Sequence, residues 1–275
     1  MTLDQALLQA TTRIVRRDAE RLLEHLLQRD RAWRMTHGSD ELEPAVHEQL
    51  QALVARRAAL EPLQYLLGEQ EFYGLALHVT RDTLIPRPET EHLVEAVLEW
   101  CSTQPQPLRM VDVGTGTGAI ALALANELPE ATIAACDLSP AALAVAQENA
   151  ARLGLGARVA FRQSDLLAGF ADECFDAVVS NPPYVPTGDA AEMQPEVRDH
   201  EPHLALFAGE DGLAIYRRLV VEARARLRAG GLLAMEIGYG QREALRGLLE
   251  GWQEVRFVED YAGIPRVVLA IRPAR

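Results

Sequence analysis

The chain has 275 residues, of which 48% are hydrophobic, and no stretch approaches the ~18 consecutive apolar residues of a membrane-spanning helix. All 27 basic residues are arginine, which excludes a Schiff-base lysine and a phosphate-loop lysine. A net charge of −13 disfavours a phosphate backbone as a partner. The three cysteines are widely spaced and the charged N-terminus lacks an apolar signal region. We therefore expect a cytoplasmic protein that binds no metal, no membrane and no nucleic acid directly, and we expect no oligomer.

The first part of the chain has a helical pattern. Leu3 and Leu7, and then Leu22, Leu23 and Leu26, recur at helical spacing among charged residues. Residues 38–44, "GSDELEP", interrupt this pattern, which then resumes over residues 46–54. We predict a small helical domain over residues 1–69, followed over residues 70–84 by a β-hairpin connector with its turn at Gly74. Pro88 is suited to the first turn of a helix that continues to about residue 100.

The third part, residues 85–275, alternates between strands and helices. Helices are predicted over Ile120–Leu128, Ala141–Leu153 and Leu213–Leu227, with a weaker helical region at Leu167–Asp172. The strand-like runs are "LRMVDVG", "ATIAACD", "ARVAFRQSD", "FDAVVSN", "LLAMEIG", "VRFVED" and "RVVLAIR". Alternation of this kind predicts an α/β fold with a parallel sheet. Only "YAGIP" separates the last two runs, which is too short for a crossover, so we expect them to form an antiparallel hairpin.

A glycine-rich turn follows the first of these strands, in "MVDVGTGTGAIALALA". Gly114, Gly116 and Gly118 allow a sharp turn and a close approach of a ligand to the backbone. The spacing is G-x-G-x-G, and Ala119 stands where the dinucleotide-binding pattern requires a glycine, which argues against a nicotinamide dehydrogenase. Because a plain strand–helix turn seldom uses three glycines, we predict a ligand site here.

The next two strands also end in residues suited to a ligand. Asp137 lies 21 residues after Gly116 and is placed to accept hydrogen bonds from two ribose hydroxyls. The alternative, that Asp137 caps the next helix, is less favoured because Ser139 and Pro140 suit that position better. Asp165 and Leu166 would lie beside an adenine, although a structural cap remains the alternative there. Together these strand ends predict a site for an adenosine-containing cofactor.

The fourth strand ends in "SNPPYVP". Two consecutive prolines fix φ and remove two backbone donors, so the segment is rigid and cannot continue a sheet. Its carbonyls stay free to accept hydrogen bonds, and Asn181 adds a side-chain amide. We interpret Asn181–Tyr184 as a preformed polar notch with an aromatic wall at the same sheet edge.

Taken together, these motifs resemble those of the class I S-adenosylmethionine-dependent methyltransferases. More narrowly, the chain resembles the HemK/PrmC-type glutamine N5-methyltransferases that modify the GGQ motif of peptide chain release factors. The resemblance runs essentially from end to end and includes "EFYGLALHV", "LIPRPETE", "DVGTGTGAIALALA", "SNPPYVP", "VRDHEPHLALFAGEDGL" and "YAGIPRVVLA". It implies a Rossmann-like seven-stranded methyltransferase sheet over residues 85–275.

The resemblance also implies the partners and the roles of site residues. The cofactor would be S-adenosylmethionine, with S-adenosylhomocysteine as product, and the helical domain over residues 1–69 would recognise a release factor. Arg87 to Glu91 would line the methionine end of the cofactor. Asn181 would contact both cofactor and substrate. The implied cofactor-binding residues are Gly114, Thr115, Gly116, Thr117, Gly118, Asp137, Leu166 and Asn181, and the implied substrate-binding residues are Asn181, Pro182, Pro183 and Tyr184.

A chemical role for the NPPY segment follows from its acceptors. The Asn181 side-chain oxygen and the Pro182 carbonyl would accept the two N–H bonds of a glutamine amide, and Tyr184 would pack against the amide plane. Such orientation would direct the nitrogen lone pair at the methyl group. The catalytic residues would therefore be Asn181, Pro182 and Tyr184.

Other interpretations stay open. The same notch could orient the exocyclic amine of a flipped adenine, as in a nucleic-acid adenine-N6 methyltransferase. A ribosomal protein could be the glutamine substrate, although relatives of that kind typically read "PRSP" where this chain reads "PRPETE". A small-molecule-binding protein that kept the fold without the chemistry is a third alternative. His200 and His203 lack the helical spacing of a metal site.

Overall fold

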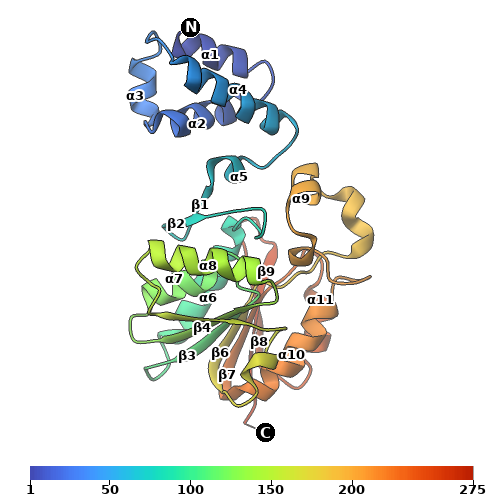
Figure 1. Cartoon of the computed structure of the whole chain (residues 1–275). Helices are drawn as coiled ribbons and strands as arrows, with labels where there is room; N and C mark the ends of the chain where they lie inside the picture. The colour runs from blue at the N-terminus through green and yellow to red at the C-terminus, as the bar shows by residue number, and fades with distance from the viewer. Residues whose placement is uncertain (275) are drawn as a thin grey trace. The chain divides into compact units, whose positions relative to one another are not determined.

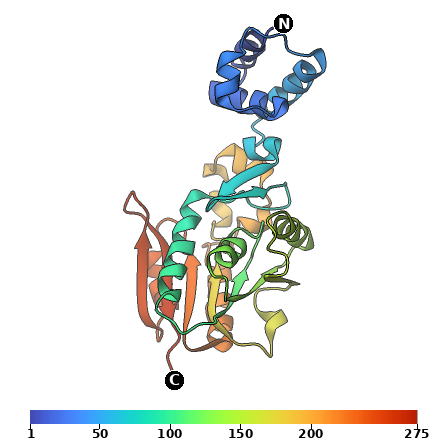
Figure 2. The same cartoon turned by 90° about the vertical axis from the view of Figure 1, so that its left-hand side faces the viewer.

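The computed structural model describes residues 1–274, which form two compact units (Figures 1 and 2). Unit 1 comprises Met1–Glu69 together with Gln194–His200, a short segment from much later in the chain. Unit 2 contains the rest of the described residues. Across residues 1–274, none of the helices combines the length and the apolar character that crossing a bilayer requires.

Unit 1 is helical, which confirms the periodicity of its sequence. Thr2 caps the first helix by accepting a hydrogen bond from the Gln5 backbone, and the Gln5 side chain returns a bond to Thr2. Leu22, Leu23 and Leu50 are completely buried in its core. The helices are α1 (Leu3–Ala10), α2 (Arg16–Leu27), α3 (Arg31–Thr36), α4 (Pro44–Ala58), α5 (Leu63–Leu67) and α9 (Pro195–His200).

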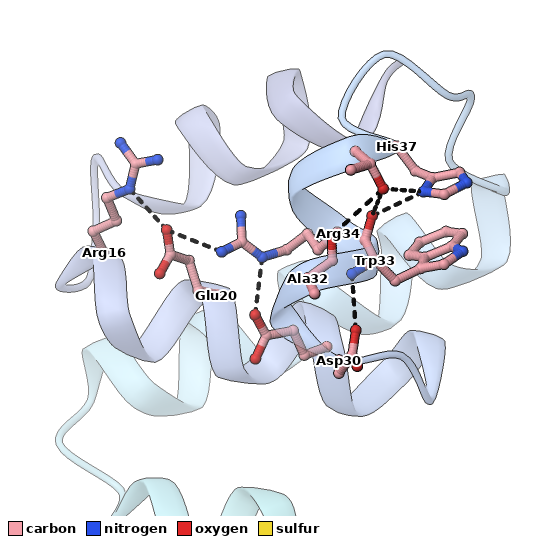
Figure 3. Close-up of polar contacts among 9 residues, drawn as sticks. Arg16, Glu20, Asp30, Ala32, Trp33, Arg34 and His37 are labelled. Carbon is pink, nitrogen blue, oxygen red and sulfur yellow. Dashed lines mark hydrogen bonds and ion pairs between the residues drawn. The ribbon is translucent and has the colours of Figure 1, made fainter.

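A buried arginine joins two of these helices. Arg34 on α3 is only 5% exposed, and its guanidinium reaches back to two carboxylates on α2 (Figure 3). Its Nε lies 3.0 Å from Glu24 and its Nη2 lies 3.3 Å from Glu20. Two opposite charges therefore compensate for the burial of one cation.

Unit 2 contains the seven-stranded sheet, and all seven predicted strands are confirmed. Their order across the sheet is β5-β4-β3-β6-β7-β9-β8. β9 is antiparallel to both β7 and β8, as the short connection before it predicts, while the pairs from β5 to β7 are parallel. A separate two-stranded sheet pairs β1 (Glu69–Phe72) with β2 (Leu75–His78). The strands of the large sheet are β3 (Arg109–Val113), β4 (Thr132–Asp137), β5 (Val159–Gln163), β6 (Phe175–Ser180), β7 (Leu227–Glu236), β8 (Gln253–Glu259) and β9 (Pro265–Ile271).

Helices cover both faces of this sheet (Figures 1 and 2). Alternate strand residues point to opposite faces, so Met110 belongs to one apolar core and Val111 to the other. The first core includes residues of α6 (Glu91–Cys101), α7 (Ala119–Glu127) and α8 (Pro140–Arg152). The second includes residues of α10 (Ala214–Arg226) and α11 (Arg242–Leu248). The result is a three-layer Rossmann-like fold.

Two local elements differ from the sequence-based expectation. The weak helical region at Leu167–Asp172 is a single 3-10 turn, η2 (Ala168–Phe170), because Gly169 in its middle disfavours a longer helix. No helix is expected from the sequence between β7 and β8, yet α11 lies there. Its seven residues include Gly247, so its helical pattern is short and weak.

Three further 3-10 turns lie in the loops of unit 2. Pro88 begins the 3-10 turn η1 (Pro88–Thr90), which leads directly into α6. The connection from β6 to α10 contains η3 (Thr187–Glu192), α9 and η4 (His203–Ala205).

The strand register brings four strand ends to one edge of the sheet. Val113 pairs with Cys136 of β4 and with Ser180 of β6, and Asp137 pairs with Gln163 of β5. The glycine turn, Asp137, Leu166 and Asn181 follow directly at this edge, where α/β folds hold their ligands.

Candidate functional site

A cavity of about 190 Å³ opens at this edge within unit 2. It brings together most of the residues that the sequence predicts. The predicted residues that line it are Gly114, Thr115, Gly116, Thr117, Asp137, Leu166, Asn181 and Pro183. Gly118, Pro182 and Tyr184 are not part of the lining among the described residues.

The glycine turn forms one wall, and Asp112 holds it in place. The carboxylate Oδ2 of Asp112 accepts hydrogen bonds from the Thr115 hydroxyl at 2.6 Å and from the Ala121 backbone at 3.2 Å. Burial raises the pKa of Asp112 to about 7. Within residues 1–274 its Oδ1 has no hydrogen-bond partner. Asp112 thus fixes the turn against the start of α7.

The three glycines of the turn differ in what surrounds them. Gly114 and Gly116 have φ of 73° and 56°, and an added Cβ at either position would meet no atom within 4 Å. Backbone at these two residues therefore faces open space. At Gly118, with φ of 85°, a Cβ would lie 3.1 Å from Leu122 and 3.2 Å from Ala146. Gly118 thus serves the packing of α7 against α8.

Asp137 lies beside this turn. Its Oδ2 accepts a hydrogen bond from the Gly116 backbone, and its Oδ1 accepts one from the Ser139 backbone, both at 2.9 Å. Burial raises the pKa of Asp137, and these backbone bonds oppose that rise. Ser139 caps α8 by accepting a bond from Ala142, and Pro140 is the first helical residue, as predicted. Each carboxylate oxygen keeps a second lone pair for a ligand.

The third strand end contributes an apolar side chain on an unusual backbone. Leu166 lines the cavity with φ of 47°, a left-handed conformation that costs a leucine about 1–2 kcal/mol. Its carbonyl accepts bonds from the Ser164 hydroxyl at 2.8 Å and from the Cys136 thiol at 3.4 Å. Asp165 also lines the cavity and pairs with Arg218 at 2.9 Å.

Two segments that the sequence analysis does not fully identify form the opposite wall. They are residues 82–84, 86 and 87, of which only Arg87 was predicted, and residues 202, 204 and 205. Glu201 joins them, because its carboxylate pairs with Arg87 and accepts a bond from the Ile85 backbone at 3.2 Å. The Glu201 side chain is 1% exposed. Of the predicted range Arg87–Glu91, Arg87 and Thr90 line the cavity.

Asn181 stands at the junction of these walls. Its side-chain Nδ2 donates a hydrogen bond to the Thr90 hydroxyl at 3.1 Å. Within the described chain, neither its Oδ1 nor the Pro182 carbonyl has a hydrogen-bond partner. Ser180, just before it, anchors β6 to β3 by donating to the Val113 carbonyl at 2.6 Å. The notch therefore presents two free acceptors on a rigid base.

Tyr184 packs into the protein rather than forming an aromatic wall of the cavity. Its hydroxyl donates to the Glu236 carboxylate at 3.4 Å, and burial raises its pKa. Gln241 donates to its carbonyl at 3.0 Å, and a Cβ on Gly238 would come within 2.9 Å of its ring. These contacts fix the far end of the NPPY segment.

Sequence reasoning missed two buried polar residues that support the site, Glu236 and Asn149, and it did not foresee that Thr90 binds Asn181. Thr90 and Glu236 lie behind Asn181, with 2.6 Å between the Thr90 hydroxyl and the Glu236 carboxylate. Asn149 on α8 donates to the Thr117 carbonyl in the glycine turn and to the His78 carbonyl in β2. An asparagine on the buried face of a predicted helix is the signal that could have identified Asn149.

Comparisons with known proteins show which family this chain resembles. The family model of the PrmC N-terminal domain matches residues 3–68, and the model of the methyltransferase small domain matches residues 91–196. A protein named release factor glutamine methyltransferase from Koribacter versatilis is 44% identical over 96% of this chain and 94% of its own length. Another of that name, from Cereibacter sphaeroides, is 47% identical over 94% of this chain and 91% of its own length.

Among solved structures, the fold is similar to that of a methyltransferase from Pyrococcus furiosus. The TM-score is 0.53 at 17% sequence identity, over 81% of this chain and 98% of that one. This likeness concerns the fold. The identity and coverage of the relatives go further and show that the chain belongs to the release factor glutamine methyltransferase family.

Proposed function

We propose that this protein transfers the methyl group of S-adenosylmethionine to the side-chain amide nitrogen, N5, of the glutamine in the GGQ motif of peptide chain release factors. The observation that carries the proposal is the unpartnered Oδ1 of Asn181 in the lining of a glycine-walled cavity, followed directly in the chain by the unpartnered carbonyl of Pro182. A primary amide has two N–H donors, so it matches this pair. The names of the relatives supply the class of substrate.

The residues present fit the proposed cofactor. Open space above Gly114 and Gly116 forms a cradle that any side chain would reduce. Asp137 offers carboxylate lone pairs for ribose hydroxyls, and Leu166 offers an apolar surface for an adenine. S-adenosylmethionine, when bound, supplies a methyl group on a positively charged sulfonium, which is electrophilic without further activation.

The chain contributes orientation to the reaction. Asn181 Oδ1 and the Pro182 carbonyl would hold both N–H bonds of the glutamine amide, leaving its nitrogen lone pair directed into the cavity. Prolines 182 and 183 keep these acceptors in place because their φ angles are fixed. Holding two reacting groups in line lowers a barrier by up to several kcal/mol. We propose Asn181 and Pro182 as the catalytic residues, and Tyr184 as a positioning residue that acts through the rigidity of the segment.

The helical N-terminal unit is proposed to recognise the folded release factor. It matches the PrmC N-terminal domain model and exposes the apolar side chains of Leu8, Val15 and Met35. Removal of residues 1–60 should abolish transfer to the folded factor while S-adenosylmethionine still binds. Unchanged transfer by the shortened protein would disprove this role.

The function is tested with purified protein, methyl-labelled S-adenosylmethionine and a release factor. A release factor with its GGQ motif changed to GGA, a glutamine-containing ribosomal protein and an adenine-containing oligonucleotide serve as alternative acceptors. We expect label only in the intact release factor. Label in the oligonucleotide or in the ribosomal protein alone would transfer the assignment to that substrate. Cofactor binding without label in any acceptor would contradict all of these activities.

A further inference from the structure

Asn181 begins a chain of three hydrogen-bonded polar groups. The Asn181 Nδ2 is 3.1 Å from the Thr90 hydroxyl, and that hydroxyl is 2.6 Å from the Glu236 Oε2. Asn181 follows β6, Thr90 ends η1, and Glu236 is the last residue of β7, so three separate segments meet here. Thr90 and Glu236 are 4% and 3% exposed, so water contributes little to this chain.

A threonine hydroxyl has a single proton, which makes the chain directional. An ionised Glu236 carboxylate only accepts hydrogen bonds, so Thr90 must donate its proton to Glu236. The Thr90 oxygen is then left only with lone pairs toward Asn181. It can bind the N–H of the Asn181 amide, whereas the amide oxygen would meet it as a second acceptor.

The two ends of an asparagine amide have nearly the same size, so hydrogen-bond partners decide which end points inward. Here the nitrogen is engaged with Thr90, and within residues 1–274 the Oδ1 has no partner. An inverted amide would present a donor to the substrate where the proposed chemistry needs an acceptor. Asn181 alone does not fix this choice.

We propose that Glu236 and Thr90 are positioning residues, which hold the Asn181 amide with its nitrogen inward and its oxygen presented to the substrate amide. The consequence for turnover rests on the proposed function, whereas the orientation of the amide does not. Protonation of Glu236 reverses the direction of these hydrogen bonds. A carboxylic acid donates to the Thr90 oxygen, and the Thr90 hydroxyl can then donate to the oxygen of an inverted Asn181 amide. Methyl transfer should therefore fall as Glu236 becomes protonated.

Among the groups that contact one another around Glu236, Glu236 is the one whose pKa lies near neutral pH. Burial raises its pKa to about 7, opposed by the bonds from Thr90 and Tyr184 and by the charge of Arg266, while Glu89 adds to the rise. The hydroxyl of Tyr216 donates to the Glu236 backbone carbonyl at 2.8 Å. Burial raises the pKa of both tyrosines, and the pKa of Arg266 is also raised, so these three keep their protonation states.

The test compares the wild-type protein with Thr90→Val, which keeps the shape and removes the hydroxyl, and Thr90→Ser, which keeps the hydroxyl. We expect Thr90→Val to lower kcat by about tenfold or more, and Thr90→Ser to stay within about threefold of wild type. Because Thr90 lines the cavity, the dissociation constant for S-adenosylmethionine is measured for each variant, and kcat is compared at saturating cofactor. Equal loss in both variants would assign the effect to packing, and full activity of Thr90→Val would overturn the proposal.

The pH dependence of kcat is a second measurement, and a change in packing alone would not alter it. In wild type, kcat should rise as pH increases through the pKa of Glu236, near 7. Glu236→Gln cannot ionise, so its kcat should be lower and should lose this rise. A profile identical to wild type in Glu236→Gln would contradict the proposal.

An NMR measurement tests the orientation of the Asn181 amide independently of the proposed function. The side-chain NH2 signal of Asn181, assigned by its loss in Asn181→Asp, is recorded in the nitrogen-15 NMR spectrum of the full chain. Its hydrogen-exchange protection should be lost in Thr90→Val and kept in Thr90→Ser. That result without methyl transfer to a release factor would refute the proposed function alone. Unchanged protection in Thr90→Val would refute the positioning role, whatever the activity.

Discussion

Each unit of this protein buries a charged side chain, and the two are compensated in different ways. In unit 1, Arg34 lies between Glu20 and Glu24, and every member of the network belongs to α2 or α3 (Figure 3). In unit 2, Glu236 has no ion pair among the described residues and is bound by the hydroxyls of Thr90 and Tyr184. Opposite charges stabilise the ionised state, whereas neutral hydroxyls leave a carboxylate poised to change protonation.

The difference teaches what each network is suited to do. The Arg34 network joins two helices and includes no residue that lines the cavity. The Glu236 network ends at Asn181, which does line it. We therefore expect disruption of the first to lower stability and disruption of the second to lower activity.

The largest expected effect is at the cavity end of the Glu236 network. Asn181→Ala removes the acceptor proposed to orient the substrate amide, so kcat should fall by about 10²–10³-fold, as for loss of one preorganised hydrogen-bond partner elsewhere. Kinetics with a saturating release factor measure it. Asn126→Ala, at an exposed asparagine on α7, is the matched control and should retain wild-type kcat. Substantial activity in Asn181→Ala would remove Asn181 from the proposed mechanism.

In the Arg34 network, the expected effect is on stability. Arg34→Met keeps the length of the side chain but leaves Glu20 and Glu24 facing each other without their shared cation. We expect the unfolding free energy to fall by on the order of 3 kcal/mol, measured by denaturant titration. Arg31→Met, at an exposed arginine on the same helix, should change it by less than about 0.5 kcal/mol. Equal losses of unfolding free energy in both variants would show that the buried Arg34 contributes no more to stability than the exposed Arg31.

The Glu236 network should also reveal itself in the pH dependence of stability. The pKa of Glu236 is raised to about 7 in the folded protein from its ordinary value of 4.5. Between these values the folded state keeps a proton that the unfolded state releases, so Glu236 lowers stability progressively as pH rises. From about pH 4.5 to about pH 7, its contribution should fall by on the order of 2–3 kcal/mol.

Comparison with Glu236→Gln isolates this effect. Burial also raises the pKa values of Asp112 and Asp137, but both proteins contain these groups, so their contributions cancel in the difference. Wild type should lose stability relative to Glu236→Gln when both are titrated with denaturant at about pH 5 and about pH 8. A constant difference between the two proteins would mean that Glu236 does not titrate in this range.

The two networks also mark how far sequence reasoning could reach. The glycine turn, Asp137 and the NPPY segment each lie within a few residues of a strand end, so local pattern and strand alternation located them together. The bond between Thr90 and Asn181 spans 91 residues, and that between Thr90 and Glu236 spans 146. Glu236 ends an apolar strand and has no local motif that marks it. Its role depends on the tertiary structure, in which β7 lies next to β6 and Glu236 binds Thr90 of η1.

The smallest expected effect concerns Asp137. Its carboxylate is bound by backbone N–H groups, whereas Glu20 and Glu24 are bound by a cation and Glu236 by hydroxyls. Asp137→Asn keeps one oxygen, which can still accept the Gly116 N–H, but turns an amide donor toward the Ser139 N–H. The loss of one charge-assisted bond to a ribose hydroxyl should weaken S-adenosylmethionine binding by about tenfold, measured by calorimetry. Asp172→Asn, exposed and outside the cavity lining, should bind the cofactor normally. An asparagine at position 137 has one oxygen and cannot replace both carboxylate acceptors. Normal binding of S-adenosylmethionine by Asp137→Asn would therefore mean that other residues hold the ribose.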